Sequence, residues 1–181
     1  MVSGLSLKEE YMKLKVGKRI ERSLYRKIHS LMPIPCVDLV IERSDYVLVG
    51  KRTTNPLKGM WFLPGGRLMR NERVWEAGRR IAWEETGLKV SVVEILGWDE
   101  TFFHSDPFGH RRGTHTINVI LRAYSGRGAI RADGQHSELK WIPRDKIETL
   151  IPLHPRVENI INCGRKYEID GVEDPFEMVC A

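Results

Sequence analysis

The segment from Gly65 to Leu88 carries two features that could support chemistry, a pair of glycines at its start and a pair of glutamates near its end. Gly65 and Gly66 have no side chains, so their backbone carbonyls can approach a ligand or ion closely. Glu84 and Glu85 follow an apolar stripe, where a carboxylate needs a cation or strong donors because an unpaired buried charge is costly. Carboxylate and carbonyl oxygens suit Mg²⁺, so the segment indicates a divalent-metal site.

A helix must position these glutamates. Asn71 is a candidate N-cap, Glu72 to Thr86 is the predicted helix, and Gly87 is its C-terminal stop. Residues at helical spacing form the inward face of this helix: Val74, Ala77, Gly78 and Ile81. One of the two glutamates lies one turn further along the same face.

Strands are expected on both sides of this helix in the chain. A β-hairpin is predicted from Cys36 to Glu42 and from Tyr46 to Lys51. Further strands are predicted at Val90–Leu96, Thr116–Tyr124 and Leu139–Ile142, and helices at Pro143–Leu150 and Pro155–Tyr167. This order of elements favours an α+β fold with a mixed sheet.

The chain divides into an N-terminal helical arm, residues 1–32, a central domain, residues 33–168, and a C-terminal tail, residues 169–181. In the arm, Leu24, Ile28 and Leu31 form a narrow apolar stripe suited to packing on the body or on a partner. The Pro33–Pro35 stretch ends the arm because proline cannot continue a helix.

Composition narrows the class of protein. The 181 residues suit one domain with short extensions, and the formal net charge of +5 fits a phosphate-bearing ligand. The basic residues are spread along the chain without a long block, so we expect no nucleic-acid partner. The three cysteines lack metal or disulfide spacing, and no stretch is long and apolar enough for a membrane. We therefore expect a cytoplasmic protein without a membrane partner.

The Gly65–Leu88 segment resembles the Nudix box, which is the signature of Nudix hydrolases. Eight positions fall on the box in register: Gly66, Glu72, Arg80, Ala82, Glu84, Glu85, Gly87 and Leu88. The resemblance implies a Nudix fold, in which a mixed β-sheet is sandwiched between helices, and divalent-metal hydrolysis. One position departs from the box. Ile81 stands where the family carries a glutamate that helps to bind the catalytic metals.

GDP-mannose mannosyl hydrolases, a branch of this family, also lack that glutamate. The stretches from Gly50 to Thr53, from Trp61 to Arg67 and from Asp133 to His136 are similar to theirs, and the similarity extends from about Tyr25 to Lys166. The resemblance implies that water attacks the anomeric carbon of a nucleotide-diphosphate sugar. The expected substrate is GDP-mannose or GDP-glucose, and the products are GDP and free hexose.

The same resemblance assigns the metal and the base. The Gly65 carbonyl, Glu85 and Gln135 would bind one Mg²⁺, with Mn²⁺ as a substitute. His136 would be the general base, a role that suits a group titrating near neutral pH.

Four further residues receive roles from the resemblance. Arg52 and Arg67 would hold the diphosphate and stabilise the leaving group, because arginine offers forked donors to phosphate. Arg80 would belong to the catalytic set by orienting the glutamates. Asp38 would lie near the sugar, and Tyr25 would stack on the base.

The loop from Glu100 to Gly113 is a second departure. The branch has a histidine there that aids binding of the leaving group. Thr101 takes its place in a gap-free match, and His104 lies nearby.

Two other functions stay open. The adjacent Glu84 and Glu85, with Glu72, would also serve ordinary pyrophosphohydrolysis, in which water attacks phosphorus. A non-catalytic module that binds nucleotide sugars is the third hypothesis. Because the resembling branch dimerises through its N-terminal arm, we expect a homodimer.

Overall fold

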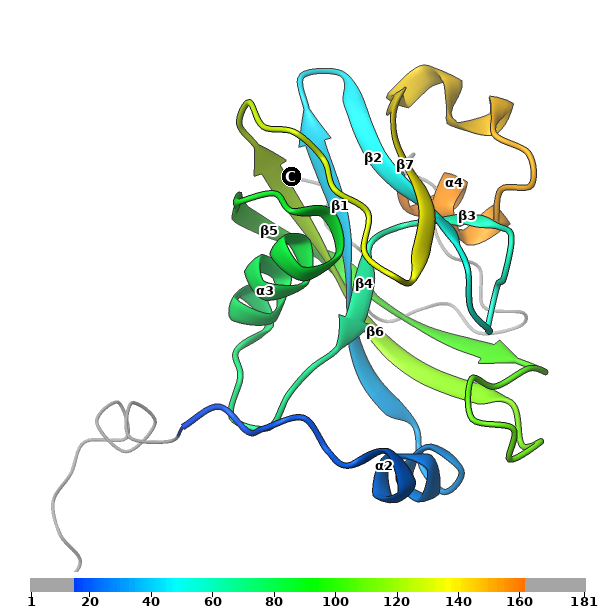
Figure 1. The fold of residues 1–181 in the computed structure, drawn as a ribbon. Coiled ribbons are helices and arrows are strands. Elements are labelled where there is room, and N and C mark those ends of the chain that lie inside the picture. The colour runs from blue at the N-terminus through cyan, green and yellow to red at the C-terminus, as the bar shows by residue number, and fades with distance from the viewer. Residues whose placement is uncertain (1–14, 162–181) are drawn as a thin grey trace, which may run out of the picture.

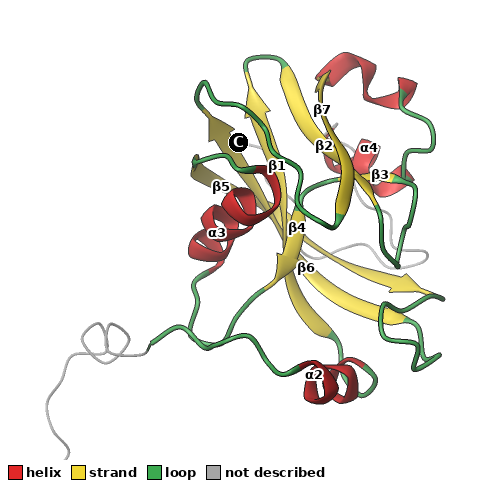
Figure 2. Ribbon diagram, in the orientation of Figure 1, coloured by secondary structure: helices red, strands yellow, loops and turns green. Residues whose placement is uncertain are grey.

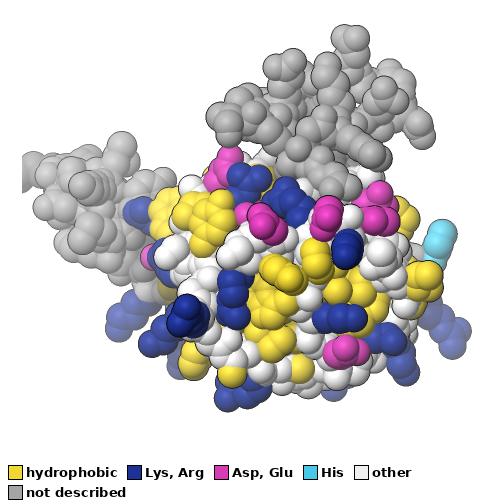
Figure 3. All heavy atoms as spheres, turned by 90° about the horizontal axis from the view of Figure 1, so that it is seen from above, with side chains coloured by type: hydrophobic (Ala, Val, Ile, Leu, Met, Phe, Trp, Pro, Cys, Tyr) yellow, Lys and Arg dark blue, Asp and Glu magenta, His cyan; other side chains and the backbone are white. Residues whose placement is uncertain are grey.

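The computed structural model describes residues 15–161. Residues 1–14 of the arm and the predicted tail, 169–181, lie outside this range, as does the end of the last predicted helix. Within residues 15–161, no helix is long and apolar enough to cross a membrane. Lys and Arg side chains on the face in Figure 3 are interspersed with acidic and apolar ones rather than gathered in one patch.

One mixed sheet organises the described chain (Figure 1). Its strands are β1 (Ile34–Arg43), β2 (Tyr46–Arg52), β3 (Trp61–Phe62), β4 (Gly65–Arg67), β5 (Val90–Phe103), β6 (Thr114–Ser125) and β7 (His136–Pro143). Strand β1 is central. It runs parallel to β6 and antiparallel to β4, and the predicted hairpin joins it to β2. Strand β7 pairs with β2, and β5 pairs with β6.

Helices cover both faces of this sheet (Figure 2). On one face, α3 (Val74–Thr86) packs on Val37, Leu39 and Ile41 of β1. On the other, η1 (Arg144–Thr149) and α4 (Pro155–Ile161) enclose a core that includes Val40. Alternate residues of one strand thus feed two apolar layers, as the period of a strand requires. The prediction of an α+β fold with a mixed sheet between helices is confirmed.

Helix α3 begins later than predicted. Its N-cap is Arg73, whose backbone N–H donates to the Glu76 carboxylate at 3.1 Å. Asn71 was the wrong cap, because its backbone has a left-handed φ of 63° and its side chain instead donates to the Lys15 carbonyl. The helix ends at Gly87, as predicted, with a φ of 72°.

A glycine in the middle of α3 lets the helix approach the sheet closely. A Cβ atom on Gly78 would lie 2.9 Å from Cδ1 of Leu121 and 3.2 Å from Cγ2 of Val92. The close approach outweighs the low helix propensity of glycine. It also fixes the depth at which the glutamates of α3 meet the sheet.

Two other boundaries differ from the prediction. Strand β5 extends to Phe103 rather than ending at Leu96, and β-bulges near Val92 and Leu96 break the alternation that marks a strand. The predicted loop from Glu100 is therefore strand at its start. The predicted helix from Pro143 to Leu150 is a short 3₁₀ helix with a kink at Lys146.

The described part of the arm contains helix α2 (Arg22–His29). Before it, the Gly17 N–H donates to the Arg70 carbonyl at 2.7 Å, which ties the arm to the loop that precedes α3. Leu24 and Leu31 of the predicted stripe are 53 % and 66 % exposed. Ile28 is half-buried, so residues 15–161 leave two of the three residues of the stripe exposed.

Candidate active site

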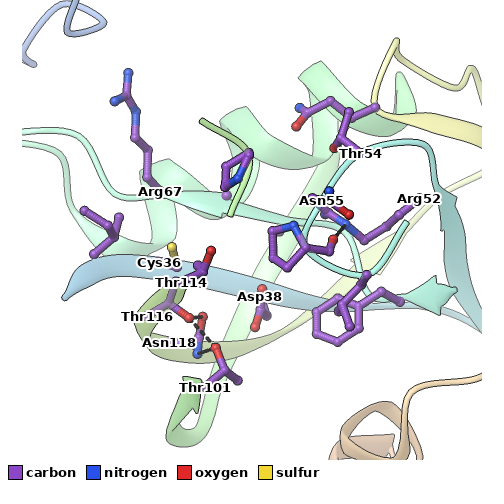
Figure 4. Close-up of a pocket in the computed structure, with 18 of the residues that line it drawn as sticks. Cys36, Asp38, Arg52, Thr54, Asn55, Arg67, Thr101, Thr114, Thr116 and Asn118 are labelled. Carbon is purple, nitrogen blue, oxygen red and sulfur yellow. Dashed lines mark hydrogen bonds between the residues drawn. The ribbon is translucent and has the colours of Figure 1, made fainter. Parts of the chain in front are cut away.

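A cavity of about 730 Å³ lies among α2, β1, β4, α3 and the loop after β2. Figure 4 shows side chains from several of these elements facing one another across it. Most residues that the resemblance implicates line this cavity: Tyr25, Asp38, Arg52, Gly65, Arg67, Arg80, Glu85 and Gln135. His136 is not among the lining residues.

Glu85 is one of two buried carboxylates that line the cavity, the other being Asp38. Glu85 is 6 % exposed, and its Oε2 accepts the Gly65 N–H at 3.0 Å. Burial raises the pKa of Glu85 to about 8, an effect that the Gly65 N–H opposes and the Asp133 charge reinforces. A carboxylate in this position gains from a nearby cation.

Asp38 lies beside Gly65 because strands β1 and β4 pair at these two residues. A Cβ atom on Gly65 would lie 2.1 Å from Asp38 Oδ1, so glycine is required for the carboxylate to come this close. The glycine pair therefore does more than expose its carbonyls. It brings the edge of β4 against Asp38 and under Glu85.

The other two glutamates of the box are held by Arg80. Its guanidinium donates to both Glu72 oxygens, from Nε at 2.6 Å and Nη2 at 2.8 Å. It also donates to Glu84 at 3.2 Å and to the Arg67 carbonyl at 3.0 Å. Glu84 lies at the rim, with its side chain 37 % exposed, and also pairs with Arg19. Arg80 thus orders the loop and helix rather than facing a ligand alone.

Arg52 and Arg67 approach the cavity from different strands. Arg52 Nε donates to the Pro56 carbonyl at 3.0 Å, and its charge opposes the rise in the pKa of Asp38 and of Glu85 that burial causes. The Arg67 guanidinium stacks on the Tyr25 ring at 4.1 Å. Arg67 Nη1 is buried and has no hydrogen-bond partner among the described residues. A phosphate oxygen would satisfy it.

Gln135 ends the turn that precedes β7, and His136 is the first residue of that strand. Gln135 lines the cavity and donates from Nε2 to Asp133 at 3.2 Å. The His136 side chain is fully buried, and its Nδ1 lies 2.8 Å from Asp133 Oδ1. Its ring packs against Gly50, and Nε2 has no partner in the described part of the chain. Burial lowers the pKa of His136, with Asp133 opposing, which favours the neutral ring.

Ile81 occupies the helix face one turn before Glu85. It is 1 % exposed and also lines the cavity. Its side chain lies next to Gly66, 3.5 Å from where a Cβ atom on that residue would be. The missing box glutamate therefore leaves an apolar surface at this point of the site.

The donors present fit one divalent cation. Buried Glu85 lacks a cationic hydrogen-bond partner among the described residues. The Gly65 backbone beside it and the Gln135 amide in the same cavity can supply neutral oxygens. Between residues 15 and 161, three or more His, Cys, Asp or Glu side chains are nowhere grouped to hold a metal. A site built from one carboxylate with carbonyl and amide oxygens suits a hard cation that keeps water or phosphate ligands.

Sequence reasoning missed a polar network below Asp38. Arg156, at the start of α4, donates to Asp38 Oδ2 at 2.7 Å and to Asp99 Oδ1 at 2.6 Å. Arg156 is 7 % exposed and shares the inward face of α4 with Val157 and Ile160. An arginine four residues before Ile160 on an apolar helix face was the available signal, because such a residue requires a buried partner.

The choice between Thr101 and His104 is resolved in position. Thr101 lies on β5, is 8 % exposed and lines the cavity, whereas His104 is exposed and does not line it. The Thr101 hydroxyl contacts Thr116 and Asn118 at this wall.

Sequence comparisons relate the chain to one family and to curated proteins. A profile of the family described as NUDIX domain matches residues 32–162. The chain is 32 % identical over 144 residues to low-salt glycan biosynthesis protein Agl8 of Haloferax volcanii, which covers 80 % of this chain and 90 % of that protein. It is 31 % identical over 147 residues to the ADP-ribose pyrophosphatase of Methanocaldococcus jannaschii, covering 78 % and 83 %.

A solved structure of a NUDIX hydrolase has a similar fold. The crystal structure of a MutT NUDIX hydrolase from Burkholderia pseudomallei superposes with a TM-score of 0.61, at 24 % sequence identity, over 74 % of this chain and 99 % of that one. At this identity the likeness concerns the fold.

Proposed function

The chain belongs to the NUDIX domain family, whose members hydrolyse nucleoside diphosphate derivatives, and we propose that it releases the free sugar from a nucleotide-diphosphate sugar. The substrate is GDP-mannose or GDP-glucose, and the products are GDP and hexose. Water attacks the anomeric carbon, the bond from that carbon to the phosphate oxygen breaks, and the diphosphate leaves.

The observation that carries this proposal is Ile81. Attack on phosphorus in the family relies on carboxylates along the inner face of the helix, and here that face offers Ile81 followed by Glu85. One buried carboxylate supports one metal ion. One ion is sufficient to bind a diphosphate leaving group. When water attacks the sugar carbon, the oxygen of that water ends in the free sugar.

The ligands of the ion are assigned within the same proposal. The Gly65 carbonyl, Glu85 and Gln135 hold Mg²⁺ or Mn²⁺, all three from residues that line the cavity. The bound ion supplies positive charge that neutralises the departing diphosphate. Arg80 keeps Glu72 and Glu84 in place, and through the Arg67 carbonyl it anchors the strand that carries Gly65.

Arg52 and Arg67 bind the diphosphate in this proposal. The unpaired Nη1 of Arg67 and the place of Arg52 in the lining of the cavity support it. Fixed guanidinium groups stabilise the charge that develops on the leaving oxygen. Tyr25, stacked on Arg67, lies where an aromatic face can meet the nucleobase.

His136 is the proposed general base. Its contact with Asp133 fixes a neutral tautomer with the proton on Nδ1, so the Nε2 lone pair is available to accept a proton from water. Asp38, on the far side of Gly65, faces the sugar. Because His136 lies behind Gly50, the Asp133–His136 turn must shift toward the cavity for the proton transfer.

Ordinary pyrophosphohydrolysis is the second candidate. Glu84 lines the cavity beside Glu85, and one relative is named as an ADP-ribose pyrophosphatase. The position of Glu72 weighs against it, because both carboxylate oxygens are taken by Arg80.

We also propose a cytoplasmic homodimer joined through the arm. Apolar residues exposed along it would be buried in such an interface: Val16, Ile20, Leu24, Leu31 and Met32. A mass by light scattering twice that of the 20.9 kDa chain supports this, and a monomeric mass contradicts it.

A panel of nucleotide sugars tests the function. Purified protein is incubated with Mg²⁺ and GDP-mannose, GDP-glucose or ADP-ribose, and the products are separated. Release of free hexose with GDP supports the proposal. Sugar phosphate with a nucleoside monophosphate supports the second candidate, and tight binding without products supports a non-catalytic module.

A further inference from the structure

The wall of the cavity on β5 and β6 carries a closed group of three uncharged polar side chains. Thr101, Thr116 and Asn118 lie together in Figure 4, on one side of Asp38 and away from Arg52 and Arg67. The oxygens Thr101 Oγ1 and Thr116 Oγ1 are 2.5 Å apart, and Thr116 donates to Asn118 Oδ1 at 3.0 Å. All three residues line the cavity.

The hydrogen positions follow from counting donors. Thr116 has one hydroxyl proton and gives it to Asn118, so the proton between the two threonines comes from Thr101. Asn118 Nδ2 donates to Asp99 Oδ1 at 3.2 Å and to Thr101 Oγ1 at 3.5 Å. The protons of the cluster are taken up within the cluster and by Asp99, and oxygen lone pairs remain for a ligand.

This wall therefore accepts hydrogen bonds, as does the Asp38 carboxylate next to it. Arg156 neutralises Asp38 and Asp99 from behind and holds both in place. A phosphate oxygen is itself an acceptor and gains nothing here, whereas a sugar hydroxyl is a donor. Arg52 and Arg67 thus suit the phosphates of a ligand, and this wall suits its hydroxyl groups.

We propose that Thr101, Thr116 and Asn118 form a subsite that binds the hydroxyl groups of the sugar beyond the diphosphate. The proposal rests on the proposed function for the identity of the ligand as a nucleotide sugar. It adds the residues that discriminate between sugars, and the orientation of the ligand, with its phosphates toward Arg52 and Arg67.

The test asks whether Thr116→Val weakens the binding of a nucleotide sugar more than it weakens the binding of the nucleotide alone. Dissociation constants for GDP-mannose and GDP are measured by calorimetry, with Ca²⁺ in place of Mg²⁺ and the ligands checked to be intact afterwards. Valine keeps the shape of threonine and removes the hydroxyl. Thr149→Val, on η1 with its hydroxyl bonded to the Lys146 carbonyl, is the matched control.

We expect the variant to bind GDP-mannose about fivefold to tenfold more weakly and GDP within twofold of the wild type. Equal weakening for GDP and GDP-mannose, or no change for GDP-mannose, overturns the subsite. Unchanged GDP binding shows that the variant is folded, and Thr101→Val provides a second variant. The result does not depend on which bond is hydrolysed.

Discussion

Two halves of the candidate site differ in how completely the fold assembles them. The metal half comprises the residues proposed to bind the ion, Gly65, Glu85 and Gln135, which line a common cavity. The base half is the proposed base His136, whose ring is fully buried behind Gly50 with Nε2 unpaired among the described residues. Both halves match the same family pattern. The difference shows that a residue can match a motif although its side chain does not line the cavity.

The largest effect is expected from the metal half. Chelation with EDTA should abolish hydrolysis, and Mg²⁺ or Mn²⁺ should restore it. Glu85→Gln keeps the shape and removes the charge, so turnover at fixed Mg²⁺ should fall by about 10³-fold. The measurement is a steady-state assay of GDP release. Full activity in EDTA would remove the metal half from the account.

Glu85 should also make the stability of the metal-free protein depend on pH. Its pKa is about 8 in the fold and 4.5 as the ordinary value. Between these values the folded chain keeps a proton that the unfolded chain has lost. The free energy of unfolding should therefore fall as pH rises from 4.5 to 8. The fall should be a few kcal/mol, because each unit of pKa difference corresponds to about 1.4 kcal/mol.

Urea unfolding in EDTA across this pH range measures the effect, with Glu85→Gln as the reference. The difference between wild type and variant should be greatest in favour of the wild type at low pH. Mg²⁺ should reduce the slope, because it stabilises the ionised carboxylate. Parallel curves for the two proteins would mean that Glu85 is ionised without metal.

The base half should respond to removal of its imidazole. His136→Gln should lower turnover by about 10²-fold with little change in GDP binding, since a general base acts on the reacting water. Activity and calorimetric GDP affinity are measured on the same preparation. Turnover near wild type would leave His136 as a buried structural residue.

Gly50→Ala tests the base half by itself, because the added methyl group contacts the His136 ring. A Cβ atom there would lie 2.4 Å from the His136 ring, so we expect a loss of about 1–3 kcal/mol in stability and a lower turnover. Gly126→Ala, where a Cβ atom would contact nothing within 4 Å, is the matched control and should change stability little. Equal behaviour of the two variants would show that the ring moves freely.

The smallest effect is expected at Glu84. It lies at the rim between Arg19 and Arg80, and exposed ion pairs contribute about 0–1 kcal/mol. Glu84→Gln should therefore lower turnover by less than about tenfold. A loss as large as that of Glu85→Gln would extend the metal half to both glutamates and favour attack on phosphorus.

The sequence predicted the elements whose pattern is periodic. Helix α3 and its stop at Gly87 follow from local spacing, and the hairpin follows from two apolar runs around a polar turn. The cap at Arg73 was missed because Asn71 is drawn into a tertiary contact with Lys15. The length of β5 was missed because its bulges break the alternation.

In the candidate site, the residues of the box and of the Asp133–His136 segment could be singled out because they form contiguous motifs, although His136 does not line the cavity. The network of Asp38, Asp99 and Arg156 could not, because it joins residues 57 and 118 positions apart in the chain. Contacts of that kind depend on the register of β1, β5 and α4 in the folded protein.

Hydrolysis in ¹⁸O-labelled water tests the central claim, that the bond broken is the one at the sugar carbon. Reaction products from GDP-mannose are analysed by mass spectrometry after a single turnover. Attack on the anomeric carbon predicts that the label appears in free hexose and that GDP remains unlabelled. Label in a phosphate group of any product would contradict it.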